Sequence, residues 1–268
     1  MDEKIEKALK GFILYGDDFT EEEITQWFKE EEEAYADLGA KNKKTYLYKY
    51  HEWNKQLGFN YLNRVRFSNA LGLGSAYGDE FLPIIEKIDN LIIIEPSKAF
   101  TKEKKIKDTP CTYLKPLPSG EILLESDTID LILCFGVLHH IPNVSRVFQE
   151  LNRVLKKNGL FLVREPIVSM GDWRFKRKGL TKNERGIPLK IFRDIITKAN
   201  FMILKETLCD FSVISKIAKL FGIIPYNNVL LTRLDLISSR FFFWNYDYHA
   251  SSLLKKIRPA SVFFLLSK

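Results

Sequence analysis

The sequence predicts a doubly wound α/β domain, in which helices cover both faces of a mainly parallel β-sheet. Four apolar runs are typical of buried strands: 65–71, 91–94, 128–134 and 160–163. A glycine-rich stretch, 70–78, overlaps the end of the first run, and Glu95 closes the second. With a helix expected between the glycine turn and the second strand, this order predicts a nucleoside-binding site, because glycines let the backbone approach the ligand and an acid binds ribose hydroxyls.

The glycine spacing narrows the choice of nucleoside. A nicotinamide-binding turn has the pattern Gly-x-Gly-x-x-Gly, but counting from Gly72 and Gly74 puts the third position at Tyr77, and Gly78 comes one residue late. No Gly-Lys-Ser/Thr follows the turn, which argues against a nucleoside triphosphate site. A nucleoside without a pyrophosphate, such as S-adenosylmethionine, fits this loop. The alternative is that the glycines serve only the turn.

A second group of features follows the strand at 128–134. The loop Val137-Leu138-His139-His140 precedes an amphipathic helix from about Val144 to Leu155. We expect Lys156 and Lys157 in the last turn of that helix and Gly159 just beyond it. The strand 160–163 then ends at Arg164-Glu165-Pro166.

With these features in this order, residues 67–166 resemble the class I S-adenosylmethionine-dependent methyltransferases, in the branch with Val-Leu-His-His after the fourth strand. The resemblance implies a Rossmann-like sheet of seven strands, the last antiparallel, and S-adenosylmethionine as the cofactor. It implies cofactor-binding roles for Gly72, Gly74, Ser75, Gly78, Glu95, Pro96, Cys134, Phe135, Gly136 and His139. Two positions depart from the family pattern, because Ala70 and Lys115 stand where acidic residues are common.

Methyl transfer to a hydroxyl also needs a group that removes the proton. A histidine that titrates near neutrality suits this role, so His139 and His140 are the predicted bases, with Glu165 and Asp172 as competitors. Alternatively, His139 packs beside the cofactor and His140 hydrogen-bonds the following helix.

The acceptor is predicted from the loop after the fifth strand. Residues 164–188 resemble bacterial methyltransferases of surface-polysaccharide and other glycan pathways, which implies O-methylation of a small molecule or a sugar or glycan precursor. Within this stretch Trp173 is followed by five basic residues: Arg174, Lys176, Arg177, Lys178 and Lys182. They predict an anionic acceptor such as a nucleotide sugar, unless the loop is simply a solvated basic one.

Charge and motifs bear on the other classes of acceptor. The chain has a net charge of +7, but residues 1–40 hold thirteen acids against four lysines, so the remainder carries +16. An RNA methyltransferase or RNA-binding protein is therefore the alternative function. Residues 134–137 read Cys-Phe-Gly-Val, which lacks the Asp/Asn-Pro-Pro-aromatic motif of DNA amino-methyltransferases. Three scattered cysteines without ligand spacing predict no metal site and a reducing, cytoplasmic location.

Three segments are expected. Residues 1–60 form a helical segment that covers the cofactor site, with a capping box at Thr20–Glu23. Residues 61–268 form the methyltransferase domain, and 207–258 are inserted between its last two strands. We interpret the insertion as a substrate-side cap, with a homodimer surface or a peripheral membrane contact as alternatives. No apolar run approaches the ~20 residues that span a bilayer.

Overall fold

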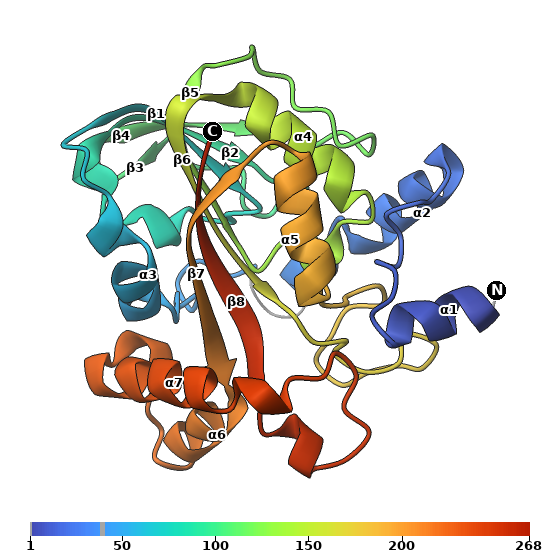
Figure 1. The fold of residues 1–268 in the computed structure, drawn as a ribbon. Coiled ribbons are helices and arrows are strands. Elements are labelled where there is room, and N and C mark those ends of the chain that lie inside the picture. Colours follow the sequence, from blue (N-terminus) through green and yellow to red (C-terminus); the bar gives the residue numbers. More distant parts are fainter. Residues whose placement is uncertain (1, 38–40) are drawn as a thin grey trace.

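An eight-stranded sheet runs through the computed structural model, which describes residues 2–37 and 41–268 (Figure 1). The strands are β1 (Phe67–Leu73), β2 (Ile88–Ile94), β3 (Lys105–Ile106), β4 (Thr109–Leu114), β5 (Ile129–Phe135), β6 (Leu155–Pro166), β7 (Met202–Phe211) and β8 (Pro259–Ser267). They lie in the order β3-β4-β2-β1-β5-β6-β8-β7. Residue 1 and residues 38–40 of the predicted amino-terminal segment lie outside the described residues.

The strand directions confirm the predicted doubly wound sheet. Strands β4, β2, β1, β5 and β6 pair in parallel, whereas β8 is antiparallel to both β6 and β7. The last strand is thus the antiparallel one, as expected. The eighth strand is the two-residue β3, which forms an antiparallel hairpin with β4 beyond the seven predicted strands.

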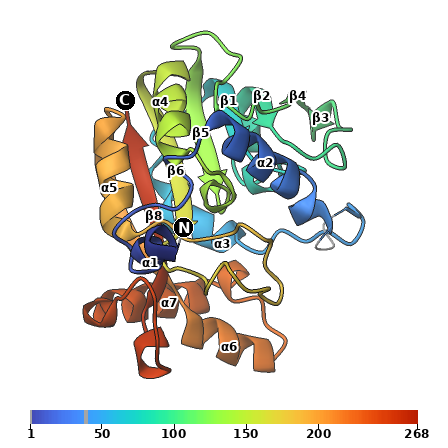
Figure 2. The same cartoon turned by 90° about the vertical axis from the view of Figure 1, so that its right-hand side faces the viewer.

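The helices surround the sheet (Figures 1 and 2). They are α1 (Asp2–Leu9), α2 (Glu21–Glu31), α3 (His51–Leu57), α4 (Val144–Val154), α5 (Leu189–Lys198), α6 (Ser212–Leu220) and α7 (Val229–Phe241). Helices α4 and α5 cover one face, α3 covers the other, and α6 and α7 follow the carboxyl end of β7 at the lower end of Figure 1. None of the helices in the described part of the chain combines the length and apolar character that crossing a bilayer needs.

Aromatic side chains fill the core on both faces of the sheet. On one face, Phe148 of α4 packs against Phe161 of β6 and Phe192 of α5, with ring centroids 5.6 and 5.7 Å apart. On the other face, Trp53 and Leu57 of α3 belong to the same buried cluster as Leu162 and Phe263. These contacts hold the parallel strands in register, so their carboxyl ends form one edge of the sheet.

Three predicted boundaries were wrong. The first strand is 67–73 rather than 65–71, and no α-helix follows the glycine turn, where short 3₁₀ turns (79–81 and 85–87) flank Pro83. Proline lacks the N–H that would continue a helix. Helix α4 ends at Val154, because Leu155 is already extended and pairs with Ile129, so Lys156 and Lys157 lie in β6. Strand β7 continues to Phe211, so the inserted residues are 212–258 rather than 207–258.

The amino-terminal segment begins its second helix as predicted. The Thr20 hydroxyl accepts a hydrogen bond from the Glu23 N–H at 3.3 Å, and Glu23 Oε2 accepts one from the Thr20 N–H at 2.8 Å. This capping box fixes the start of α2, because it satisfies backbone donors that the first helical turn leaves unpaired. Residue Trp27 on α2 then donates from Nε1 to the carbonyl of His140 at 2.7 Å, which attaches the helix to the loop after β5.

Candidate active site

A cavity of about 640 Å³ opens where β1, β2, β4 and β5 end. This volume lies in the range of small-molecule sites, about 300–1,000 Å³. The segment before β1 forms one wall through Trp27, Tyr46 and Tyr50, and the loop 114–123 forms another. None of residues 212–258 lines this cavity, so the structure gives no contact in support of their predicted role as a substrate-side cap.

The glycine turn forms one side of the cavity. Gly74 has φ +61°, and a Cβ there would lie 2.5 Å from the Val137 side chain, so only glycine fits. Gly72 lies within β1, where a Cβ would lie 2.2 Å from Ser75 Oγ. Gly74 and Ser75 line the cavity, whereas Gly72 and Gly78 lie behind the lining.

The acid after β2 faces the cavity from a fixed position. Glu95 Oε2 accepts a hydrogen bond from the Ala76 N–H at 3.0 Å, and Oε1 accepts one from the Ser97 N–H at 3.1 Å. Burial raises the pKa of Glu95 to about 7, although these two donors oppose the shift. The carboxyl group retains lone pairs that can accept hydrogen bonds from ribose hydroxyls.

We therefore expect Glu95→Gln to weaken S-adenosylmethionine binding by about tenfold to a hundredfold, since hydrogen bonds to a charged group contribute about 1.5–3 kcal/mol. The NH₂ group of the new glutamine would also face the N–H of Ala76 or Ser97, and two donors cannot form a hydrogen bond with each other. Isothermal titration calorimetry with the cofactor and its demethylated product measures the change. The matched control is Glu33→Gln, because Glu33 also contacts Ser97 but does not line the cavity. Equal affinities of Glu95→Gln and the wild type would contradict the assignment.

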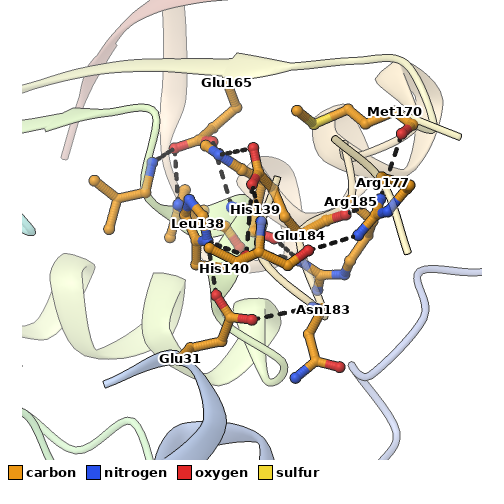
Figure 3. Close-up of polar contacts among 12 residues, drawn as sticks. Glu31, Leu138, His139, His140, Glu165, Met170, Arg177, Asn183, Glu184 and Arg185 are labelled. Atoms are coloured by element: carbon orange, nitrogen blue, oxygen red, sulfur yellow. Dashed lines mark hydrogen bonds and ion pairs between the residues drawn. The ribbon is translucent and has the colours of Figure 1, made fainter. Parts of the chain in front are cut away.

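The two histidines after β5 lie at one end of the cavity and differ in their partners (Figure 3). His139 Nδ1 lies 2.7 Å from Glu165 Oε2, and its Nε2 lies 3.6 Å from Glu184 Oε1. Burial alone lowers the pKa of His139, but the hydrogen bonds and charges of Glu165 and Glu184 raise it to about 9. His139 is therefore an imidazolium at neutral pH and cannot accept a proton.

His140 has the opposite protonation state. Its Nδ1 lies 3.0 Å from Glu31 Oε2 and 3.3 Å from the Thr181 hydroxyl. Burial and the positive charge of His139 lower the pKa of His140, so its imidazole is neutral at neutral pH. Because the Glu31 carboxylate can only accept, Nδ1 of His140 carries the hydrogen and Nε2 keeps its lone pair.

Buried charged groups hold this loop in place. Glu165 is fully buried and, besides His139, accepts hydrogen bonds from the N–H groups of Val137 and Leu138 at 2.8 and 2.9 Å. Arg185, also fully buried, donates through its guanidinium to five carbonyls, those of Tyr15, Leu138, His139, Ile141 and Pro142. The backbone around both histidines is therefore fixed from two sides.

One group of described residues has the composition of a metal site, although the sequence predicts none. A ring nitrogen of His139, a ring nitrogen of His140 and a carboxylate oxygen of Glu184 lie within 4.8 Å of one another. These groups are already paired among themselves and with the carboxylates of Glu165 and Glu31. We therefore describe the cluster as a hydrogen-bonded network around the charged His139.

The other predicted site residues divide into two groups. Pro96, Phe135 and Gly136 line the cavity together with those already described. Cys134 does not line it, and burial raises the pKa of its thiol well above the ordinary value, which is typical of a packed cysteine. Asp172 also lies outside the lining and forms an ion pair with Arg174 at 2.6 Å. The roles assigned to these residues stay predictions.

Sequence reasoning missed several residues of the cavity wall, among them Glu31, Glu80, Arg164 and Glu184. Glu31 belongs to a run of four acids that reads as a solvated helix end, and no local signal distinguishes it. Arg164 gave a usable signal, because a cation directly after the buried strand 160–163 needs a partner. Its guanidinium lies 4.4 Å from the ring centroid of Tyr50 and donates to Asn54 Oδ1 at 3.0 Å.

The cavity suits a nucleoside such as S-adenosylmethionine. Six glutamates and four cationic groups line it, the cations being Lys49, Lys115, Arg164 and the imidazolium of His139. Burial raises the pKa of Glu80 to about 8, so that carboxyl is protonated at neutral pH. Gly74 and Ser75 bring backbone close to the cavity, while Glu95 supplies the acid after β2.

Comparison with known proteins identifies the domain. Residues 71–163 match a family described as a methyltransferase domain. No curated protein matches the chain. An S-adenosylmethionine-dependent methyltransferase from Mesorhizobium loti has a similar structure, with 17% identity, a TM-score of 0.54 and coverage of 81% of this chain and 98% of its own.

Two further solved structures share the fold. A protein from Bacillus halodurans proposed to be a methyltransferase is 13% identical, with a TM-score of 0.52 over 80% of this chain and 97% of its own. A chain in the Haloferax volcanii complex between the Trm112 methyltransferase activator and its proposed methyltransferase is 10% identical, with a TM-score of 0.56 over 91% and 97%. The match at residues 71–163 includes the glycine turn, Glu95 and the histidine loop. Residues 71–163 are therefore a methyltransferase domain, and the chain has the fold of S-adenosylmethionine-dependent methyltransferases.

Proposed function

We propose that this enzyme methylates a hydroxyl group of a neutral, polar small molecule, such as a sugar or glycan precursor, with His140 as the base. The observation that carries the proposal is the neutral imidazole of His140 in the cavity wall, with Nδ1 held by Glu31. A hydroxyl acceptor needs such a base, because its proton leaves as the new bond forms.

The chain's own residues account for the other requirements. When bound, S-adenosylmethionine supplies an electrophilic methyl group. Gly74, Ser75 and Glu95 would hold this cofactor, and Trp27 and Tyr50 of the segment 1–60 would exclude water from the acceptor. Glu31 stabilises the charge that His140 acquires when it takes the hydroxyl proton. His139, already charged and held by Glu165 and Glu184, positions the loop.

The basic groups in and beside the cavity favour a neutral acceptor over an anionic one, because several of them already have partners. In the cavity wall Lys115 pairs with Glu32, and the Arg164 guanidinium donates to Asn54 Oδ1 and lies over the Tyr50 ring. The basic loop after β6 is also partly occupied: Arg174 pairs with Asp172, Lys182 with Glu30, and Arg177 donates to backbone carbonyls such as that of Thr181. An anionic sugar carrier or an RNA backbone is therefore less well matched than a neutral sugar.

The test measures transfer of a labelled methyl group from S-adenosylmethionine to three classes of acceptor: neutral glycosides, nucleotide sugars and structured RNA. We expect turnover on a neutral glycoside, with a rate that changes little with salt. Transfer to RNA with binding that falls steeply as salt increases would overturn the proposal in favour of the basic surface. Methylation confined to amines would also overturn it, because an amine acceptor does not require the proposed base in the same way.

A further inference from the structure

Helix α7 buries polar side chains and exposes apolar ones, which is the reverse of an ordinary surface helix. Its buried residues are polar, namely Thr232, Asp235 and Ser239, each with no exposed surface. Its exposed residues include Leu230 and Phe241, which are 65% and 71% accessible. A surface helix normally buries its apolar stripe, so this orientation leaves apolar area in water without a partner in the chain.

Specific polar contacts fix this orientation. The carboxylate of Asp235 accepts hydrogen bonds from the N–H groups of Asp210 and Phe211, at 3.0 and 2.6 Å, where β7 ends. The Asn228 side chain caps the helix by accepting from the Leu231 N–H at 3.0 Å. Because the polar stripe of α7 is the one that attaches it to the sheet, the apolar stripe must face outwards.

Neighbouring elements extend the same exposed surface. We define the apolar cap surface as the exposed apolar side chains of residues 217–254, of which the most prominent are Leu220, Phe221, Leu230, Phe241, Trp244 and Leu253. Leu220, Trp244 and Leu253 are 83%, 76% and 82% accessible. In both views, α6, α7 and the turn at 254–256 form the lower end of the molecule (Figures 1 and 2).

The charges interspersed with this surface have one sign. Residues 212–257 contain six exposed cations: Lys216, Lys219, Arg233, Arg240, Lys255 and Lys256. The same segment contains two acids, which do not balance the six cations. Asp235 is buried, and Asp247 lies 3.9 Å from one of the cations, Lys255. Two copies of this surface brought together would therefore place like charges opposite one another.

We propose that the apolar cap surface binds peripherally to an anionic lipid bilayer. Exposed leucine, phenylalanine and tryptophan side chains would enter the interface between headgroups and acyl chains, while the surrounding lysines and arginines would contact anionic headgroups. A charged and apolar surface of this kind matches a bilayer better than it matches water or a second copy. The surface follows the carboxyl end of β7, and the cavity lies at the carboxyl ends of β1, β2, β4 and β5, so both are at the same end of the sheet.

Flotation with vesicles tests this proposal on the chain of 268 residues without cofactor, so its result is independent of the proposed acceptor and base. We expect binding to mixed phosphatidylglycerol–phosphatidylcholine vesicles and much weaker binding to phosphatidylcholine alone. Leu220→Glu should weaken binding by about tenfold or more, because it introduces a charge at the apolar interface. The double variant Lys216→Gln/Lys219→Gln should weaken it by a similar factor, since each basic residue contributes about 1 kcal/mol.

Matched controls lie at the amino ends of the strands. Val65→Glu adds the same charge at a residue that is 87% accessible just before β1, and Lys87→Gln/Lys157→Gln removes two exposed lysines before β2 and early in β6. These variants should bind vesicles like the wild type. Equal binding of Leu220→Glu and Val65→Glu would overturn the proposal. A second result would also overturn it: the wild type does not bind vesicles, and analytical ultracentrifugation shows a concentration-dependent dimer that Leu220→Glu abolishes.

Discussion

Replacement of His140 by glutamine is expected to lower kcat by about 10²- to 10⁴-fold, the usual contribution of a positioned base. Glutamine can still donate a hydrogen bond to Glu31 and keeps most of the side-chain volume, so the loop should retain its position. Affinity for S-adenosylmethionine should therefore change little. Steady-state kinetics on the best acceptor and calorimetry of cofactor binding measure the two quantities separately.

The pH dependence gives this prediction a direction. A base must be unprotonated to act, and the pKa of His140 is lowered from 6.5 by burial and by the charge of His139. The kcat/KM of the wild type should therefore be constant near neutrality and fall as the pH drops through that lowered pKa. His140→Gln should lack this acid limb.

A histidine outside the cavity provides the control. His249 contacts the Ser169 hydroxyl at 2.8 Å and does not line the cavity, so His249→Gln should retain normal kcat and the acid limb. If His140→Gln keeps both the wild-type kcat and the acid limb, His140 is not the base. The neutral hydroxyl acceptor would then need another proton acceptor.

Replacement of Arg185 by methionine is expected to reduce the free energy of unfolding by about 3–5 kcal/mol. The five carbonyls that its guanidinium contacts would lose their donor in a buried region, and each unsatisfied acceptor is costly. Burial lowers the pKa of Arg185 to about 10, so the group stays charged at neutral pH and its hydrogen bonds are charge-assisted. Urea denaturation followed by circular dichroism measures the difference.

Two companion variants make the cause of the loss identifiable. Arg193→Met removes an exposed arginine that pairs with Glu206, and it should cost less than about 1 kcal/mol. Arg185→Lys keeps the charge but not the fork of donors, so its stability should fall between those of the wild type and Arg185→Met. Equal stability of Arg185→Met and Arg193→Met would show that the carbonyl contacts contribute little.

Much of the fold could be predicted from local patterns. The apolar runs located the central strands, and the order of glycine turn, acid and histidine loop indicated both the parallel sheet and the cofactor. The capping box at Thr20 correctly predicted the start of α2. Boundaries were less predictable where tertiary pairing decided them: Leu155 joins β6 because it pairs with Ile129, although the sequence favours one more helical turn.

The site was predictable only in part, because several of its residues act through distant partners. His139 and Glu165 were both identified as candidates, but Glu31 and Glu184 were not. Glu31 comes from α2 and Glu184 from the loop before α5, and both reach His139 or His140 only in the folded chain. Likewise, the sequence suggested a dimer or membrane surface in the insertion, but the outward orientation of Leu230 and Phe241 depends on Asp235 binding the end of β7.

The sequence by itself determined that this protein has a parallel α/β sheet, a glycine turn at Gly74 and a pair of adjacent histidines after the fourth predicted strand. It could not assign different protonation states to two neighbouring imidazoles. Only the tertiary structure decided that His139 is charged and His140 neutral, because a pKa depends on burial and on the charges nearby. Two carboxylates flank the first ring, whereas the second lies beside both a carboxylate and the positive charge of the first.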